Sequence, residues 1–157
     1  MKNTPNHALS TIKLGLFLLL SAIAHAQTPS TVECAGMSAD GGYMLKVATT
    51  GSTLDIAKKN AQKTAVETVL FQGFAAGRGC IAQKPIIAEA TLRHERSAYF
   101  DELYASVSEY SEAATQWIST PVRTKSGFKV EVLVTVHKDK LRKRLEKDGL
   151  IKALGEE

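Results

Sequence analysis

Residues 128–136, F-K-V-E-V-L-V-T-V, constrain the fold of this chain more than any other stretch. The apolar positions recur at every second residue, and they are Phe128, Val130, Val132, Val134 and Val136. A period of two places all of them on one face of a β-strand, and β-branched valine favours a pleated sheet over a helix. The stretch therefore predicts a strand with one buried face, around which the rest of the domain is expected to fold.

The N-terminus has the features of a secretory signal peptide. Lys2 and Lys13 supply positive charge, and a run of about ten apolar residues follows. Ala24-His25-Ala26 then provides the small-x-small pattern of a signal peptidase site. The apolar run is shorter than the roughly 18 residues that a membrane-spanning helix needs. We therefore predict a signal peptide at residues 1–26, an exported mature chain that is periplasmic or secreted, and no membrane span in that mature chain.

The predicted mature chain, residues 27–157, is long enough to form one domain with a buried core. The full sequence has 20 Lys and Arg residues and 16 Asp and Glu residues, which gives a formal net charge of +4. Two of the basic residues, Lys2 and Lys13, belong to the predicted signal peptide, so the mature charge is only +2. Net charge alone therefore does not indicate a class of partner.

Cys34 and Cys80 are the two cysteines of the chain. In an exported protein, an even pair of cysteines forms a disulfide more often than a metal or redox site. Such a bond would close a loop of about 45 residues and would stabilise the fold by ~3–4 kcal/mol, because it restricts the unfolded chain. The alternative is two separate buried thiols, since cysteine also packs as a small apolar residue.

Residues 54–72 follow helical spacing. Ala57, Ala61 and Ala65 recur one turn apart, so they form a stripe of small residues that allows a helix to lie close to a sheet. Thr53 offers an N-cap, and Asp55 in the first turn suits the helix dipole. We predict a core helix over this stretch.

The remaining elements complete a mixed α and β pattern. Further strands are predicted at residues 43–49 and 114–122, and the second of these forms a β-hairpin with residues 128–136. Further helices are predicted at residues 93–105 and 138–147, and residues 27–42 are expected to form a loose polar arm. The glycines of residues 73–79 are expected to end the core helix, and residues 81–92 are expected to form an irregular or edge segment. This order predicts an α+β domain, a small antiparallel sheet of three to four strands with two to three helices packed on one face.

Few residues of the mature chain are arranged for catalysis or metal binding. His94 and His137 are isolated, whereas a zinc site needs three or four ligands. The sequence also lacks the Gly-x-Ser-x-Gly turn of a serine nucleophile. We predict no metal site, no cofactor and no enzymatic activity. The alternative is an extracytoplasmic small-ligand-binding or hydrolytic domain with a pocket near His94, Tyr99 and Tyr104.

The C-terminal part of the chain is strongly basic. Ten basic and four acidic residues lie between Arg123 and Lys152, in the hairpin turn and on the predicted last helix. The candidate contact residues are Arg123, Lys125, Lys138, Lys140, Arg142, Lys143, Arg144 and Lys147.

These charges suit an acidic envelope protein or an anionic envelope surface. Nucleic acid is not the predicted partner, because the chain is predicted to be exported and no aromatic residues are interleaved with the charges. A solvated helix face without a partner is the alternative. Residues 89–112 carry a local excess of acidic residues, so head-to-tail self-association between this segment and the basic end is a further hypothesis.

Three segments share the layout of a known group of exported domains. They are the strand at residues 43–49, the helix D-I-A-K-K-N-A-Q-K-T-A at residues 55–65, and the strand V-E-V-L-V-T-V at residues 130–136, which runs into a charged helix. This layout resembles that of LPP-type bacterial lipoproteins and of the N-terminal domain of the flagellar T-ring assembly protein. The resemblance implies a small α+β module without enzymatic activity that takes part in assemblies of the bacterial cell envelope. The chain departs from the family in two respects, since no cysteine directly follows the apolar run and residues 73–92 form an insert.

Overall fold

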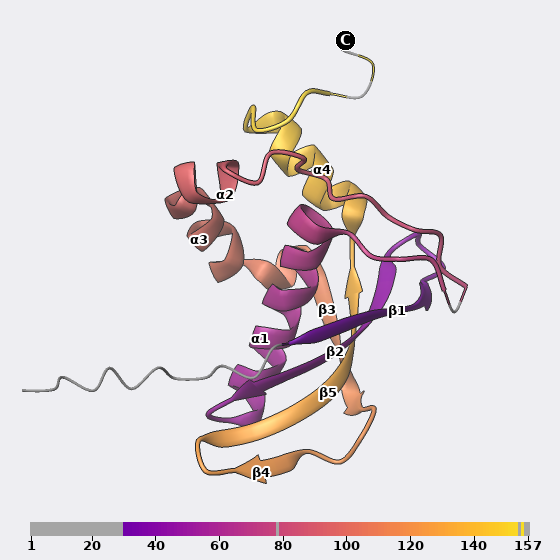
Figure 1. The fold of residues 1–157 in the computed structure, drawn as a ribbon, viewed down its shortest axis with the longest axis vertical. Helices are drawn as coiled ribbons and strands as arrows, with labels where there is room; N and C mark the ends of the chain where they lie inside the picture. The colour runs from indigo at the N-terminus through magenta and orange to yellow at the C-terminus, as the bar shows by residue number, and fades with distance from the viewer. Residues whose placement is uncertain (1–29, 78, 154, 156–157) are drawn as a thin grey trace, which may run out of the picture.

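The computed structural model describes residues 30–77, 79–153 and 155, so the predicted signal peptide lies outside the described residues. This part of the chain forms a five-stranded antiparallel sheet with the order β1-β2-β5-β3, in which β4 also pairs with β5 (Figure 1). The strands are β1 (Thr31–Met37), β2 (Tyr43–Gly51), β3 (Ser111–Trp117), β4 (Val122–Thr124) and β5 (Gly127–Val136). The helices are α1 (Leu54–Glu67), α2 (Leu92–Glu95), α3 (Ser97–Ala105) and α4 (Lys138–Lys147).

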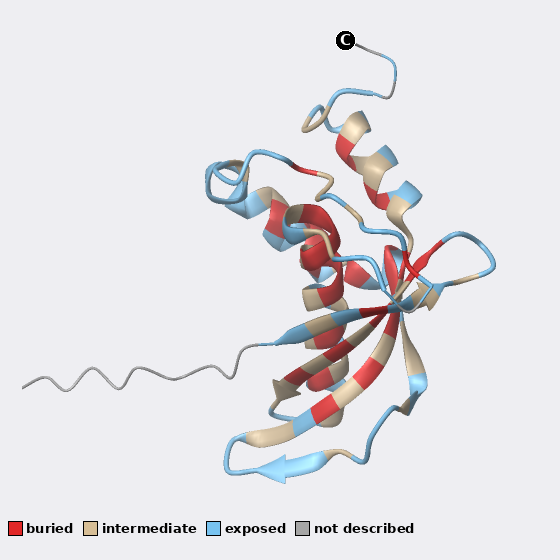
Figure 2. Ribbon diagram, turned by 45° about the vertical axis from the view of Figure 1, so that its right-hand side comes forward, coloured by how far each residue is buried: buried red, intermediate tan, exposed pale blue. Residues whose placement is uncertain are grey.

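Strand β5 lies in the middle of the sheet, as its alternating pattern predicts. It pairs with β2 on one side and with β3 and β4 on the other. Val132, Val134 and Val136 are fully buried on its inner face, and buried residues of β2 lie on the same face. Figure 2 shows the resulting alternation of buried and half-buried positions along these strands.

Helix α1 lies against the inner face of the sheet. Ala57, Ala61 and Ala65 are fully buried, so the predicted alanine stripe is the surface that packs on β2 and β5. The helix begins as predicted, because the Thr53 hydroxyl accepts a hydrogen bond from the Ile56 backbone N–H over 3.2 Å. A π-helical turn, η1 (Thr68–Gln72), continues α1. Apolar residues of α3 and α4 join the same core.

The structure confirms an α+β fold with an antiparallel sheet. The described residues form five strands and four α-helices, where the sequence predicted three to four strands and two to three helices. Residues 31–37, predicted as part of a loose arm, form edge strand β1 because Val32 and Cys34 alternate toward the core and the backbone pairs with β2. A short 3-10 turn, η2 (Val107–Glu109), precedes β3.

Two predicted elements are interrupted. The predicted strand at residues 114–122 splits into β3 and β4. Trp117 pairs with Val132 and Val122 pairs with Lys129, so the chain advances five residues on the edge while β5 advances only three. The two extra residues cannot stay in the ladder, and the chain bulges outward. The predicted helix at residues 93–105 is broken at Arg96, whose φ of −115° and ψ of 33° lie outside the helical region.

The helices of the described residues are each too short, or too polar, to cross a membrane.

Candidate functional site

Cys34 on β1 and Cys80 form a disulfide, with 6.3 Å between their Cα atoms, which confirms the predicted pairing. Cys80 belongs to a loop that we call the disulfide loop, residues 73–77 and 79–83. Its two arms are joined by backbone hydrogen bonds between Phe74 and Gln83 and between Gly77 and Cys80. The bond therefore fastens a hairpin-like loop to the edge of the sheet.

Three of the predicted basic residues form one stripe on the exposed side of α4. Lys140, Lys143 and Lys147 are exposed and lie at i, i+3 and i+7, so they share one face of the helix. Within the described part of the chain, no acidic side chain lies within ion-pair distance of these three. We call them the lysine stripe.

The other three basic residues of α4 have partners inside the domain. Arg142 pairs with Glu146 at 2.8 Å, and Arg144 pairs with Asp148 at 2.5 Å. The hydrogen bond from Arg144 lowers the pKa of the Asp148 carboxyl. Lys138 donates to the Gln83 side-chain oxygen at 3.1 Å, and its ammonium group lies over the Tyr43 ring. These three charges are therefore less available to an external partner than the lysine stripe.

The structure separates the basic hairpin turn from α4. Arg123 lies over the Phe128 ring, 5.8 Å from its centroid, and Lys125 is exposed in the turn between β4 and β5. This turn precedes the first residue of β5, whereas α4 follows the last (Figure 1). A strand of ten residues spans roughly 30 Å. The eight predicted contact residues therefore lie on two distant surfaces.

His94, Tyr99 and Tyr104 occupy three different environments. Tyr99 donates its hydroxyl hydrogen to Asp148 over 2.8 Å, and burial together with this carboxylate raises the pKa of Tyr99 to about 12. Tyr104 is buried in the core, and burial raises the pKa of its hydroxyl to about 12. His94 is exposed on α2. All three side chains lie outside the hollows described below.

Among the described residues, His137 forms an ion-pair contact with one acidic side chain, that of Asp40. His137 Nδ1 lies 3.2 Å from Asp40 Oδ2, next to a hollow of about 120 Å³ at the start of α4. A hydrogen bond from the Ser38 hydroxyl lowers the pKa of Asp40. Over residues 30–77, 79–153 and 155, His, Cys, Asp and Glu residues do not gather in groups of three or more that could hold a metal ion.

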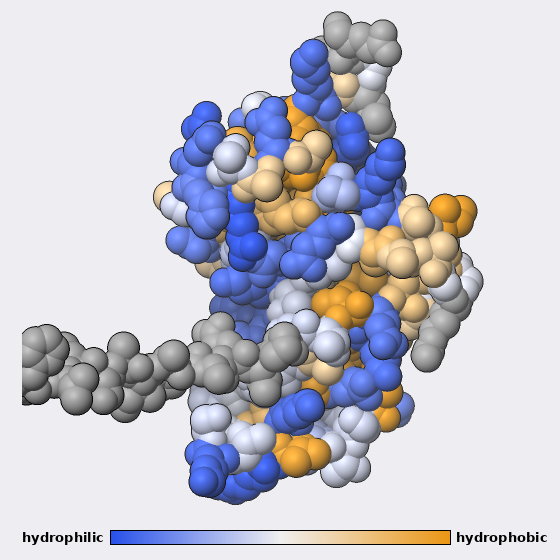
Figure 3. All heavy atoms as spheres, in the orientation of Figure 1, coloured by the Kyte–Doolittle hydropathy of each residue, from blue (hydrophilic) through white to orange (hydrophobic). Residues whose placement is uncertain are grey.

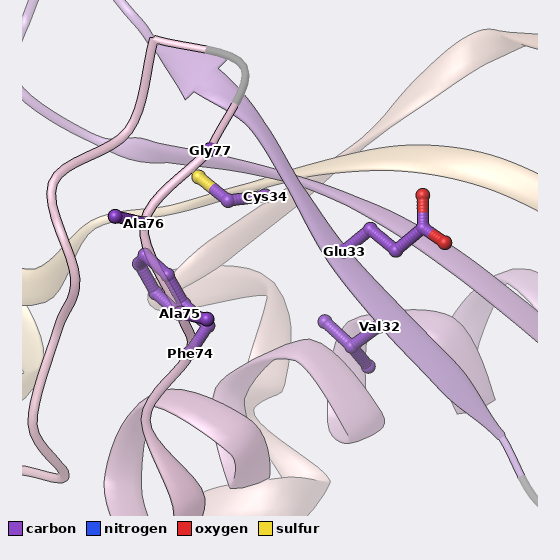
Figure 4. Close-up of a pocket in the computed structure, with 7 residues that line it drawn as sticks. All are labelled: Val32, Glu33, Cys34, Phe74, Ala75, Ala76 and Gly77. Atoms are coloured by element: carbon purple, nitrogen blue, oxygen red, sulfur yellow. The ribbon is translucent and has the colours of Figure 1, made fainter.

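Three adjacent hollows follow the inner side of β1, and the sequence did not predict them. The first, of about 380 Å³, lies between residues 32–34 and residues 74–77 of the disulfide loop (Figure 4). The second, of about 370 Å³, continues between Val32, the end of α1 and Arg93. The third, of about 350 Å³, lies between Ser30, the end of β2 and α1. We call the three together the β1 slot.

The chemistry of the β1 slot changes along its length. The first hollow is the most apolar of the three, with Val32, Phe74, Ala75 and Ala76 around it beside Glu33 and Cys34 of β1. The other two are polar, with hydroxyl, amide and charged side chains from Ser30, Thr49, Thr50, Asn60, Lys63, Thr64, Glu67, Thr68, Gln72 and Arg93. Glu67 forms an ion pair with Arg93, so these two charges offset each other. The slot thus offers one apolar and two polar positions.

Sequence reasoning missed the slot because it treated residues 27–42 as an arm. The alternation of Val32 and Cys34 around Glu33 is the signal that could have indicated a strand there. The other side of the slot comes from α1 and from the disulfide loop, which are distant in sequence. Their proximity depends on tertiary packing, which no local pattern carries.

Comparison with known proteins identified no relative: no protein-family model matches the chain, and neither a curated protein nor a solved structure shows significant similarity to it.

Proposed function

We propose that this chain is an exported, non-enzymatic binding protein of the bacterial cell envelope, and that the lysine stripe contacts an anionic surface of that envelope. The observation that carries the proposal is the difference between the basic residues of α4. Arg142 and Arg144 are held in ion pairs, whereas the lysine stripe presents three exposed ammonium groups on one helix face. The Cys34–Cys80 disulfide supports export, because disulfides persist in oxidising compartments.

Simple electrostatics indicates the strength of such a contact. A lysine close to an anionic membrane surface contributes ~1 kcal/mol. Three lysines acting together would therefore contribute ~3 kcal/mol, which corresponds to roughly a 100-fold increase in surface binding. The attraction acts over about 10 Å at moderate ionic strength, so it must weaken as salt is added. The stripe would concentrate the protein at a charged surface without fixing it there permanently.

The test is binding of residues 27–157 to lipid vesicles that contain phosphatidylglycerol, measured by co-sedimentation at low and high salt. The test variant is Lys140→Glu/Lys143→Glu/Lys147→Glu. A matched control, Lys59→Glu/Lys125→Glu/Lys129→Glu, changes net charge equally at three exposed lysines outside α4. Circular dichroism and urea unfolding establish that both variants are folded.

We expect the stripe variant to lose binding by roughly 100-fold and the control variant to lose much less. We also expect binding of the unmodified protein to fall with salt and to be absent on vesicles of neutral phosphatidylcholine. Equal losses in the two variants, or binding that does not depend on salt, would show that the stripe is not the contact surface.

The alternative of a small-ligand or hydrolytic site near His94, Tyr99 and Tyr104 gains no geometric support. Tyr104 contributes to the core, and the Tyr99 hydroxyl is already engaged with Asp148. We therefore do not propose it.

A further inference from the structure

We propose that the β1 slot binds an extended segment of another polypeptide, which adds to the sheet as a further strand beside β1. The proposal does not depend on the lysine stripe, because α4 residues contribute to none of the three hollows of the slot. It rests on the backbone of β1, on the lining of the hollows and on the charge of Glu33.

Among the described strands, β1 is the end strand of the sheet and pairs only with β2. Among the described residues, none in Thr31–Met37 forms a backbone hydrogen bond outside this pairing. In an antiparallel ladder, alternate residues point their N–H and C=O groups away from the partner strand. A regular row of such groups is matched by the backbone of another extended chain.

The hollows follow β1 in order along its length. The first is bounded on the β1 side by residues 32–34, the second by Ser30 and Val32, and the third by Ser30. Side chains on the same face of a strand recur at every second residue, about 6.7 Å apart. An added strand beside β1 would therefore point successive inward side chains toward the slot.

The lining of the slot indicates which side chains it accepts. The hollow beside the disulfide loop has apolar walls, and Ile81 of that loop is 82% exposed. Figure 3 shows apolar atoms gathered over this loop on the face that carries β1. The second hollow presents hydroxyl groups and the neutralised Glu67–Arg93 pair, and the third presents hydroxyl groups with the side chains of Asn60 and Lys63. The segment is therefore expected to carry one apolar inward residue followed by two small polar ones.

The charge of Glu33 indicates which residue the added strand would carry on its outward face. It is exposed and points away from the disulfide loop, on the opposite side of β1 from Cys34 (Figure 4). Its cross-strand neighbour Lys46 is paired with Glu131 at 2.8 Å, so Glu33 lacks an ion partner within the described residues. A lysine or arginine on the added strand would lie opposite Glu33 and be attracted to it.

The same carboxylate argues against a second copy of this chain as the occupant. The regular part of β1 ends at Cys34, because a bulge shifts the register before Gly36. Two-fold pairing of two β1 strands over Thr31–Cys34 would place the two Glu33 side chains on one face within two residue positions of each other. Like charges at such distances are unfavourable. A segment with a basic residue at that position avoids this cost.

The experiment uses a displayed library of short peptides with randomised positions, selected on the oxidised protein, residues 27–157. Selection is repeated on Ala75→Arg, which places a long charged side chain at the first hollow, and on Ala82→Arg as the matched control. Both alanines are exposed in the disulfide loop, but only Ala75 lines the slot. Neither substitution is expected to alter the fold.

We expect enriched peptides with one apolar residue, two small polar residues at the following alternate positions, and a basic residue beside the apolar one. Ala75→Arg should weaken them at least tenfold, and Ala82→Arg and the lysine-stripe variant should not. Glu33→Lys should reduce affinity for the basic peptides and increase it for versions with glutamate in place of the basic residue. Bound peptide should slow amide hydrogen exchange within residues 31–34.

Several outcomes would overturn the proposal. They are a selection without enrichment, equal effects of Ala75→Arg and Ala82→Arg, and binding that leaves the exchange of the β1 amides unchanged. Sedimentation that reveals a concentration-dependent dimer with protected β1 amides would instead assign the edge to a second copy of the chain.

Discussion

Tyr99 on α3 donates its hydroxyl hydrogen to the carboxylate of Asp148, just beyond the end of α4, over 2.8 Å. The same carboxylate accepts a hydrogen bond from Arg144 of α4. The two residues are separated by 49 positions in the sequence, and their contact joins the end of α4 to the middle of the domain. It also places a second group, the Tyr99 hydroxyl, beside a negative charge that opposes its ionisation.

We predict that the protein loses stability at high pH because of its tyrosines. Tyr99 and Tyr104 both have a pKa raised from 10.0 to about 12, Tyr99 by burial and the Asp148 carboxylate, and Tyr104 by burial. A raised folded-state pKa means that the folded protein holds the proton more tightly than the unfolded chain does. The associated stability is fully present below pH 10 and is lost as pH rises toward about 12.

The measurement is the urea midpoint of unfolding as a function of pH. Tyr99→Phe/Tyr104→Phe removes both ionisable groups, so its loss of stability above pH 10 should be smaller than that of the unmodified protein. An identical decline in the two proteins would show that other groups cause it. Near-ultraviolet absorbance follows the ionisation directly, and the late-titrating component should disappear in the variant.

We predict that the disulfide is a major contribution to stability. Cys34→Ser/Cys80→Ser should lower the free energy of unfolding by ~4 kcal/mol, because the bond closes a long loop with a sequence separation of 46 residues. Urea unfolding provides the measurement. A reductant should destabilise the unmodified protein to a similar extent and leave the variant unaffected. A variant as stable as the unmodified protein would contradict this expectation.

We predict that Gly127 tolerates no side chain. It adopts a φ of +140°, and an added Cβ would lie 2.1 Å from the backbone oxygen of Gly51, too close for any real contact. Gly127→Ala should therefore destabilise the fold by at least ~2 kcal/mol, as overpacking against backbone does. Gly149 is the matched control, since its φ of +70° is also positive but the space around it is open. Gly149→Ala should cost less, ~1 kcal/mol, and equal losses would refute the steric argument.

Local patterns predicted the elements whose formation depends on their own residues. The alternation in β5 and the alanine stripe of α1 each place residues on a buried face, and the structure buries those faces. The helix predicted at residues 138–147 has the bounds of α4, Lys138–Lys147. In these segments the face that the hydrophobic pattern predicts to be buried is the face that is buried in the structure, so tertiary packing does not alter the predicted secondary structure.

The errors arise where distant segments determine the structure. Residues 31–37 carry few apolar side chains, and they become β1 because β2 offers its edge and Cys80 fixes Cys34. The break between Trp117 and Val122 depends on the register with β5. Of the basic residues of α4, Lys140, Lys143 and Lys147 lack an ion partner among the described residues, whereas Lys138 donates to Gln83, which is far away in the sequence. The β1 slot forms only where β1, α1 and the disulfide loop, which are distant in sequence, come together.

The Cys34–Cys80 disulfide makes the formation of the β1 slot depend on oxidation of the two cysteines. Cys34 belongs to the strand and Cys80 to the loop on the other side of the first hollow, so one covalent bond holds both sides in place. Thiols in a reducing compartment remain unbonded. A newly synthesised chain with reduced cysteines would therefore lack the bond that holds the two sides of the slot together. The proposed peptide-binding site would be complete only after the chain reaches an oxidising compartment.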